Sequence, residues 1–380
     1  MTIDLDGADG LLIVGDSERS ADLYYATRFM APDPFVFLWT TAGRTLMVGD
    51  LELDRARQQA QVDEVVASSR YEAELKERGH TRPGQTDLLV ALLEDRGLAR
   101  LKVPPDFPLQ TADALRAAGL QLQAAAAPLL PQRLNKTAVE VEAVRAAMAA
   151  SEEAMEAAIA AIAAADVHER EELYLEGEVL TSERLQRLIH VTLIERDCVG
   201  RHTIAAGGRQ ACDPHQQGHG PLRAGETIII DIFPRHSTTG YFGDITRTVV
   251  KGEATPTAKR MFDLVLEGQQ LALDTIAAGV DGSQIHAAIQ SLFAQAGFLT
   301  GERDGHMEGF FHSTGHGLGL EIHEGPRIGP RGDVLASGQV VTVEPGLYYP
   351  EHGGMRIEDV VVVTDHGCDN LTNFSKYLEV

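Results

Sequence analysis

Residues 226–250 decide the fold of this chain, and they read ETIIIDIFPRHSTTGYFGDITRTVV. An apolar run carries Asp231, a turn with Gly and Tyr follows, and Asp244 opens a second apolar run. Residues 338–364 repeat this plan with Glu344 and Glu358, in the sequence GQVVTVEPGLYYPEHGGMRIEDVVVVT. Each segment predicts a pair of antiparallel strands, in which residues that face one another lie within contact distance. The two segments together predict four carboxylates that converge on one place.

The four acids stand in strands that are too apolar to hold free charges. Asp231 lies within IIIDI and Glu344 follows VVTV, and an unpaired charge in such a strand is costly to bury. A salt bridge with an arginine would explain any one of these acids taken alone. Because all four share one layout, the pattern favours metal coordination.

Three histidines lie between the two segments. Residues 310–326, FFHSTGHGLGLEIHEGP, place His312, His316 and His323 among glycines that let the backbone approach a ligand closely. Carboxylates combined with imidazole suit Mn²⁺, Co²⁺, Fe²⁺ or Zn²⁺. Carboxylates that can bridge favour two ions about 3.5–4 Å apart. The sequence therefore predicts two divalent metal ions per chain.

The length of 380 residues favours two domains. Residues 127–135, APLLPQRLN, place two prolines before a long helix expected from Thr137, so the expected domains are residues 1–130 and 137–380. The first mixes strands at 35–39 and 45–48 with helices at 53–78 and 84–97, which is an α/β pattern. The helix from Thr137 is expected to face a core with its apolar residues, which are Val144, Met148, Met155, Ile159 and Ile162.

Composition limits the classes of partner. The formal net charge is −23 and no sustained run of Lys and Arg occurs, which argues against nucleic acid as a partner. The first residues, MTIDLDGADG, carry acids, and no apolar run reaches membrane-spanning length. A cytoplasmic protein with no membrane partner is therefore expected. The 3 cysteines form no CxxC pair and imply no thiolate zinc site. Dinucleotide, phosphate-loop and GxSxG motifs are absent.

The motifs, in their order, resemble one family of metallopeptidases. IIIDIF, GYFGDITRT, HSTGHGLGLEIHEGP, TVEPGLYY and GMRIEDVVVVT are similar to motifs of prolidase (Xaa-Pro dipeptidase), aminopeptidase P and methionine aminopeptidase. The resemblance covers the chain from about Thr137 to its end. It implies an α/β (α+β) protein with an N-terminal creatinase-like domain and a C-terminal pita-bread domain. The implied reaction is metal-dependent hydrolysis of the bond before proline, in small peptides with proline in the second position.

The resemblance also implies which residues hold the metal ions. Asp231 would bind one ion, and Asp244 and Glu358 would bridge both. His316 and Glu344 would complete the second site. Glu344 would in addition act as the catalytic proton shuttle.

Other residues are implied to act on the substrate. His215, in ACDPHQQGHGP, and His323 would be catalytic, because they would position the substrate and stabilise the tetrahedral intermediate. His312 and Arg356 would bind the substrate or support the groups that do. His219 and His202 are alternatives to His215, although exposed loop histidines are the simpler interpretation of both.

One departure from the family pattern concerns the loop between the first two acids. The family usually runs Asp-x-Gly-x-x-x-x-Gly-Tyr-x-x-Asp, whereas this chain has two more residues there and no early glycine. The loop adds Arg235 and His236, which either reach a substrate carboxylate or point into solvent. Solvent is the interpretation adopted.

Several members of the family remain as alternatives. A folded N-terminal domain disfavours the single-domain methionine aminopeptidases, and the compact length favours prolidase over aminopeptidase P. The alternative of a different class is a non-catalytic peptide- or protein-binding module. Creatinase and the binding relatives have lost metal ligands, whereas all five positions are filled here. The resemblance further implies a homodimer, in which the N-terminal domain of one chain helps to wall the active site of the other.

Overall fold

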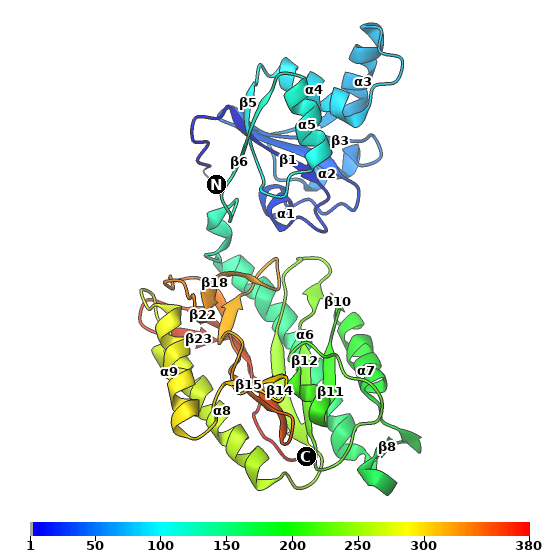
Figure 1. Ribbon diagram of the computed structural model, residues 1–380. Coiled ribbons are helices and arrows are strands. Elements are labelled where there is room, and N and C mark those ends of the chain that lie inside the picture. Colours follow the sequence, from blue (N-terminus) through cyan, green and yellow to red (C-terminus); the bar gives the residue numbers. More distant parts are fainter. Residues whose placement is uncertain (1–2) are drawn as a thin grey trace. The chain divides into compact units, whose positions relative to one another are not determined.

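The structure is a computed structural model that describes residues 3–380. The chain divides into two compact units, of which the first ends at Arg133 and the second is Leu134–Val380. Each unit has its own strands and helices (Figure 1). No helix within residues 3–380 is long and apolar enough to cross a membrane.

The first unit contains a six-stranded mixed sheet in the order β4-β3-β2-β1-β5-β6. β1 pairs antiparallel with β2 and parallel with β5. Apolar residues fill the central strand β2, where Phe35, Phe37 and Leu38 are all buried. The strands are β1 (Gly10–Gly15), β2 (Phe35–Thr40), β3 (Gly43–Val48), β4 (Glu64–Ala67), β5 (Arg100–Val103) and β6 (Gln121–Ala124).

The helices of this unit confirm one sequence prediction and correct another. They are α1 (Ala21–Thr27), α2 (Leu53–Gln59), α3 (Ser68–Glu77), α4 (Gln85–Asp95) and α5 (Leu109–Ala117). The predicted helix at 84–97 is α4, and the predicted strands at 35–39 and 45–48 lie in β2 and β3. The predicted helix at 53–78 is wrong at its centre, because β4 separates α2 from α3. Val65 and Val66 are β-branched and pair with β3, and Val66 is buried in the core.

The second unit contains two sheets that correspond to the two quoted segments. One is three-stranded, in the order β11-β12-β14, and the other is five-stranded, in the order β18-β17-β19-β22-β23. β12 pairs antiparallel with β14, and β19 pairs antiparallel with β22, as the sequence predicted. The strands are β11 (Ile204–Gly207), β12 (Thr227–Ile232), β14 (Ile245–Val250), β17 (Gly315–Gly317), β18 (Glu324–Ile328), β19 (Val340–Val343), β22 (Asp359–Val363) and β23 (Cys368–Asn370).

Two pairs of helices accompany these sheets. α6 (Ala138–Ala164) and α7 (Ser182–Ile194) contact one another and the sheet of β11, β12 and β14. α8 (Pro256–Thr275) and α9 (Gly282–Gln295) contact one another, and they pack on β19 and β18 respectively (Figure 1). Thr137 caps α6 through a reciprocal pair of hydrogen bonds with Glu140. The five apolar residues predicted to face the core from α6 are all buried.

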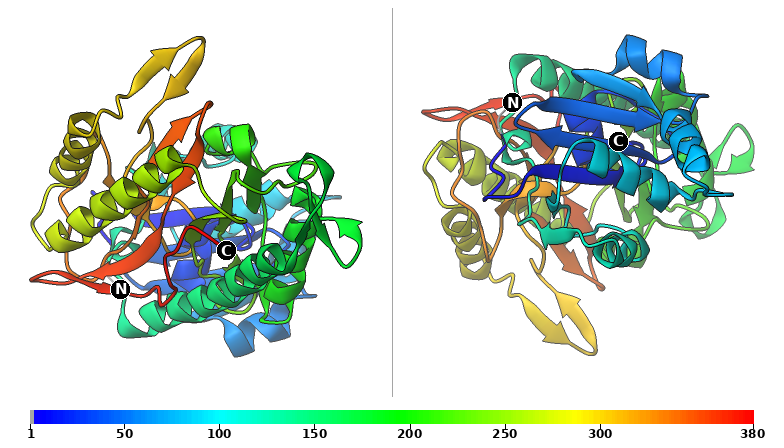
Figure 2. Two further views of the ribbon diagram at one scale, coloured as in Figure 1. Left: turned by 90° about the horizontal axis from the view of Figure 1, so that it is seen from below. Right: turned by 90° about the horizontal axis from the view of Figure 1, so that it is seen from above.

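Short two- and three-stranded ribbons complete the second unit. The hairpin of β15 and β16 is largely exposed and extends away from both helix pairs (Figure 2). β20 and β21 pair with one another, and β21 contacts β12 and β14, while β10 pairs with β13. The ribbons are β7 (Asp166–Val167), β8 (Leu173–Leu175), β9 (Glu178–Val179), β10 (Cys198–Val199), β13 (Arg235–His236), β15 (Gly301–Arg303), β16 (His306–Glu308), β20 (Gly346–Tyr349) and β21 (Gly353–Arg356).

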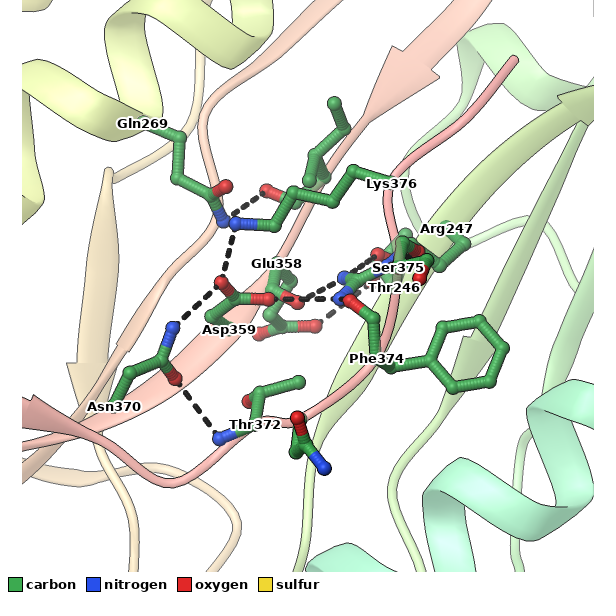
Figure 3. A network of polar contacts seen from close by, with 12 residues as sticks. Thr246, Arg247, Gln269, Glu358, Asp359, Asn370, Thr372, Phe374, Ser375 and Lys376 are labelled. Atoms are coloured by element: carbon green, nitrogen blue, oxygen red, sulfur yellow. Dashed lines mark hydrogen bonds and ion pairs between the residues drawn. The ribbon is translucent and has the colours of Figure 1, made fainter.

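A buried ion pair joins the two sheets to the C-terminal segment (Figure 3). Arg247 on β14 donates to the carboxylate of Asp359 on β22 at 2.9 Å and to the backbone oxygen of Glu358 at 2.6 Å. It also donates to the carbonyls of Phe374 and Ser375. The other oxygen of Asp359 lies 2.6 Å from the ammonium group of Lys376. Arg247 therefore holds the backbone of Glu358 in place through this hydrogen bond.

The substitution Arg247→Met is expected to lower the free energy of unfolding by about 3 kcal/mol, because it leaves Asp359 with one cation fewer at a buried site. Urea unfolding of the metal-free protein measures this change. The control is Arg145→Met, since Arg145 forms an exposed ion pair with Glu142 on α6 and exposed pairs contribute about 0–1 kcal/mol. Equal losses in the two variants would show that the Arg247 cluster adds nothing beyond a surface pair.

Candidate metal centre

The predicted site residues line one pocket of about 690 Å³ in the second unit. All five predicted metal ligands line it, and so do His215, His312, His323 and Arg356. The acids come from the strand pairs that the sequence predicted. Asp231 lies in β12, Asp244 immediately precedes β14, Glu344 follows β19 and Glu358 precedes β22. The two strand pairs therefore deliver their acids to a common cavity.

Three of these side chains meet closely enough to hold one ion. Asp244, His316 and Glu358 each offer a ligand atom, and these atoms lie within 4.8 Å of one another. Asp244 and Glu358 are buried. Glu358 accepts a hydrogen bond of 2.8 Å from the hydroxyl of Thr246, which holds its carboxylate in place.

Glu344 and Asp231 flank this group without belonging to it. A carboxylate oxygen of Glu344 lies 3.3 Å from Nε2 of His316. Asp231 accepts a hydrogen bond of 2.7 Å from Arg356 through Oδ2, while its Oδ1 is buried without a hydrogen-bond partner among the described residues. A buried carboxylate oxygen that lacks a donor fits a position beside a cation.

The carboxylates repel one another. Burial raises the pKa of Glu344 to about 8. Burial and then the charge of Glu358 raise the pKa of Asp244 well above its usual range. Burial and the charges of Glu344 and Asp231 do the same to the pKa of Glu358. Like charges brought together in this way require protons or cations to neutralise them.

His316 provides the clearest sign that a cation fits. Burial lowers the pKa of this imidazole to about 4, so it is neutral at pH 7. Nδ1 lies 3.1 Å from the backbone oxygen of Gly317, and a carbonyl can only accept, so Nδ1 carries the hydrogen. Nε2 therefore turns a lone pair towards the oxygens of Glu344 and Asp244, at 3.3 and 3.8 Å. Three electron-rich atoms that face one another fit a divalent metal ion, which neutral imidazole and carboxylates bind.

A second imidazole is held by a polar chain. Burial lowers the pKa of His312 to about 3, so this ring is neutral. It lies 2.8 Å from the hydroxyl of Tyr348, which accepts a hydrogen bond of 2.8 Å from Arg356. Because Arg356 donates to the phenol oxygen, the phenol hydrogen points to Nε2 of His312. This chain fixes Arg356, which also holds Asp231.

Of the other histidines named from the sequence, His323, His215 and His202 line the pocket. The ring of His323 stands 4.4 Å from that of His316, edge to face. Burial, followed by the nearby His215, lowers the pKa of His323. His215 and His202 are exposed side chains that line the pocket, whereas His219 does not line it. Arg235 and His236 do not line it either, and they form the half-buried strand β13.

Sequence reasoning missed the residues that orient the predicted ones. Thr246 lies two residues after Asp244 and binds Glu358, and the hydroxyl of Thr342 lies 3.3 Å from Glu344. Tyr348 links His312 to Arg356. Strand alternation could have found Thr246 and Thr342, because each stands two residues from an acid and so on the same face of its strand. Phe233, two residues after Asp231, could have been found in the same way.

A mixed α/β fold in which two strand pairs each supply two carboxylates, with a neutral histidine beside them, is typical of a class of hydrolytic metalloproteins. The sequence pattern of metallopeptidase family M24 matches residues 142–365, and the chain belongs to this family. Its fold is the pita-bread fold, as the resemblance implied, and the family depends on divalent metal ions.

Individual relatives support the same assignment. An Xaa-Pro dipeptidase of Pyrococcus horikoshii is 34% identical over 178 residues, which cover 46% of this chain and 48% of the relative. The chain thus aligns with about half the length of such curated relatives. The crystal structure of X-Pro aminopeptidase from Thermotoga maritima has a TM-score of 0.82 at 25% identity, covering 98% of both chains. Xaa-Pro dipeptidase from Bacillus anthracis also has a TM-score of 0.82 at 25% identity, covering 98% of this chain and 96% of that one.

Proposed function

We propose that the protein is an Xaa-Pro dipeptidase that uses two divalent metal ions. The observation that carries this proposal is the pocket in which Asp244, Glu358 and the neutral His316 converge, with Asp231 and Glu344 beside them. The two dipeptidases among the relatives described above support the choice of substrate. Small peptides with proline in the second position would be the substrates.

The five residues of the proposed metal site would have different roles. Asp231 would hold one ion, Asp244 and Glu358 would bridge both, and His316 with Glu344 would complete the second site. When bound, the ions would act as Lewis acids and lower the pKa of water. Mn²⁺, Co²⁺, Fe²⁺ and Zn²⁺ all suit such ligands.

Glu344 is proposed to move the proton. Its carboxylate lines the pocket, 3.3 Å from Nε2 of His316. A positioned carboxylate can take up and release a proton during the reaction. Glu344 would take a proton from the attacking water and deliver it to the imino nitrogen of the leaving proline.

Histidines and an arginine would orient the substrate. His323 and His215 border the ligand group and would donate hydrogen bonds to the scissile carbonyl and to the intermediate that follows. Arg356 and His312, fixed by Tyr348, would contact the substrate or support the groups that do. The low pKa of His312 keeps it neutral, and its two ring nitrogens contact Ser313 and Tyr348, so it would support Tyr348 and add no charge.

The test is hydrolysis of Ala-Pro and Ala-Pro-Ala by metal-stripped protein, with and without Mn²⁺, Co²⁺ or Zn²⁺. Cleavage of the dipeptide alone is the expected result, and Ala-Ala is the control without proline. Preference for the tripeptide would instead identify an aminopeptidase P, the second candidate, which the likeness to the X-Pro aminopeptidase of Thermotoga maritima favours. No cleavage with any metal would support a binding module on this fold.

The cellular setting belongs to the same proposal. We infer a cytoplasmic homodimer in which the first unit of one chain helps to wall the active site of the other. The family resemblance supports this arrangement. Light scattering after size exclusion checks the dimer, since a monomer at all concentrations would contradict it.

A further inference from the structure

Four apolar residues line the pocket together with the acids and imidazoles, and they are Ile204, Pro214, Phe233 and Ile322. Phe233 is the largest of these four side chains, and it is half-buried. Phe233 is therefore the largest apolar side chain that a substrate in this pocket can meet.

Phe233 directly follows β12, the strand that supplies Asp231. Asp231 and Phe233 stand two residues apart, and both line the pocket. Ile232, which lies between them, is fully buried and does not line the pocket. Ile204 is paired with Asp231 across β11 and β12, and it lines the same pocket. Phe233 therefore lies where β12 ends at the pocket that contains Asp231.

The chain after Phe233 is tied down by backbone hydrogen bonds. The carbonyl of the buried Pro234 accepts from the N–H of Gly243 at 3.0 Å. His236 donates to Tyr241 at 2.9 Å and accepts from Gly240 at 2.8 Å. β13 also pairs with β10. These hydrogen bonds order the loop directly after Phe233, including its two extra residues.

We propose that Phe233 is a specificity-determining residue whose ring limits the size of the side chain that precedes proline. This inference rests on the proposed function, because only one residue varies among Xaa-Pro dipeptides. In an apolar pocket, one methylene group more or less on the substrate changes kcat/KM by about 10- to 200-fold. The wild-type protein consequently favours Ala-Pro over Phe-Pro.

The test compares kcat/KM for Ala-Pro, Leu-Pro and Phe-Pro in metal-loaded wild type, Phe233→Ala and Phe233→Leu. Phe233→Ala is expected to raise the ratio of Phe-Pro to Ala-Pro by at least about 10-fold, and Phe233→Leu by less. Phe242→Ala is the matched control, since Phe242 is half-buried in the same loop and does not line the pocket. Metal content, measured by mass spectrometry, is expected to be equal in all variants.

The outcomes separate the inference from the function on which it rests. Wild type that cleaves none of the three dipeptides overturns the proposed function, and the inference with it. Wild type that cleaves them while both Phe233 variants keep its ratio overturns the inference alone. The inference is also overturned if the Phe233 variants change the preference between Ala-Pro and Ala-pipecolate but leave the preference for the residue before proline unchanged. Phe233 would then contact the second residue of the substrate. If Phe233→Ala does not fold, Phe233→Leu decides.

Discussion

Replacing Glu344 with alanine is expected to lower kcat/KM for Ala-Pro by at least about 1,000-fold, because one side chain is proposed to be both a metal ligand and the proton shuttle. General acid–base catalysis alone contributes about 10²–10⁴-fold. Glu344 faces His316 at 3.3 Å, and burial raises its pKa to about 8. Kinetics on Ala-Pro, together with metal analysis by mass spectrometry, measure both losses.

Two further variants make this prediction specific. Glu344→Gln keeps the size of the side chain but cannot carry the proton, so it is expected to lose turnover even when excess metal restores the bound ions. Glu351→Ala removes an exposed glutamate outside the pocket and is expected to keep wild-type kinetics. Near-normal turnover of a metal-loaded Glu344→Ala protein would contradict the proposed role of Glu344 as the proton shuttle.

The strand pairs could be predicted from the sequence because their information is local. The repeated plan of acid, turn and acid predicted β12 with β14 and β19 with β22, and both pairs form. The same plan predicted that the acids converge, and the structure brings Asp244 and Glu358 together with His316. The roles assigned to individual ligands stay predictions. Local sequence patterns therefore predict most of the residues that could hold the metal ions.

The remaining features depend on contacts between distant segments. Ile204, Pro214 and Ile322 reach the pocket from separate parts of the chain, so no local pattern shows that they line the same pocket as Phe233. The contact of His312 with Tyr348 likewise spans 36 residues. The strand β4 was missed because its pairing with β3 overrides the helical pattern around it. Tertiary context decides such positions.

The stability of the metal-stripped protein is expected to fall as pH rises from about 7 to 9. The folded-state pKa values of Asp244, Glu344 and Glu358 are raised, so the folded state holds more protons than the unfolded state, and stability is lost as pH rises towards those values. A carboxyl with a pKa near 8, as in Glu344, contributes a loss of about 1.4 kcal/mol over this range.

The shifted histidines and Asp9 act outside this pH window. His312 and His316 have lowered pKa values, so the unfolded chain binds more protons than the folded protein at low pH. Stability therefore rises with pH up to about 6.5, the usual pKa of histidine. Asp9, with a pKa lowered to about 2, acts only below about pH 4. Burial raises the pKa values of Cys198, Cys212 and Cys368 above the usual value of 9, so these thiols add a loss only as the pH approaches 9. The decline between pH 7 and 8 therefore belongs to the buried carboxylates, and urea unfolding in EDTA at pH 7, 8 and 9 measures it.

The substitution Asp244→Asn is expected to separate the two properties of this cluster. It removes a charge that Glu358 and Asp231 repel, so the metal-free variant should be more stable than metal-free wild type at pH 8. It also removes a ligand, so Mn²⁺ should no longer stabilise the protein, whereas wild type gains about 2.7 kcal/mol when Mn²⁺ is at 100 times its dissociation constant. Asp263→Asn, at an exposed position of α8, should behave as wild type. If Asp244→Asn kept the full gain with Mn²⁺, Asp244 would not be a metal ligand, and the repulsion among these acids would need another explanation.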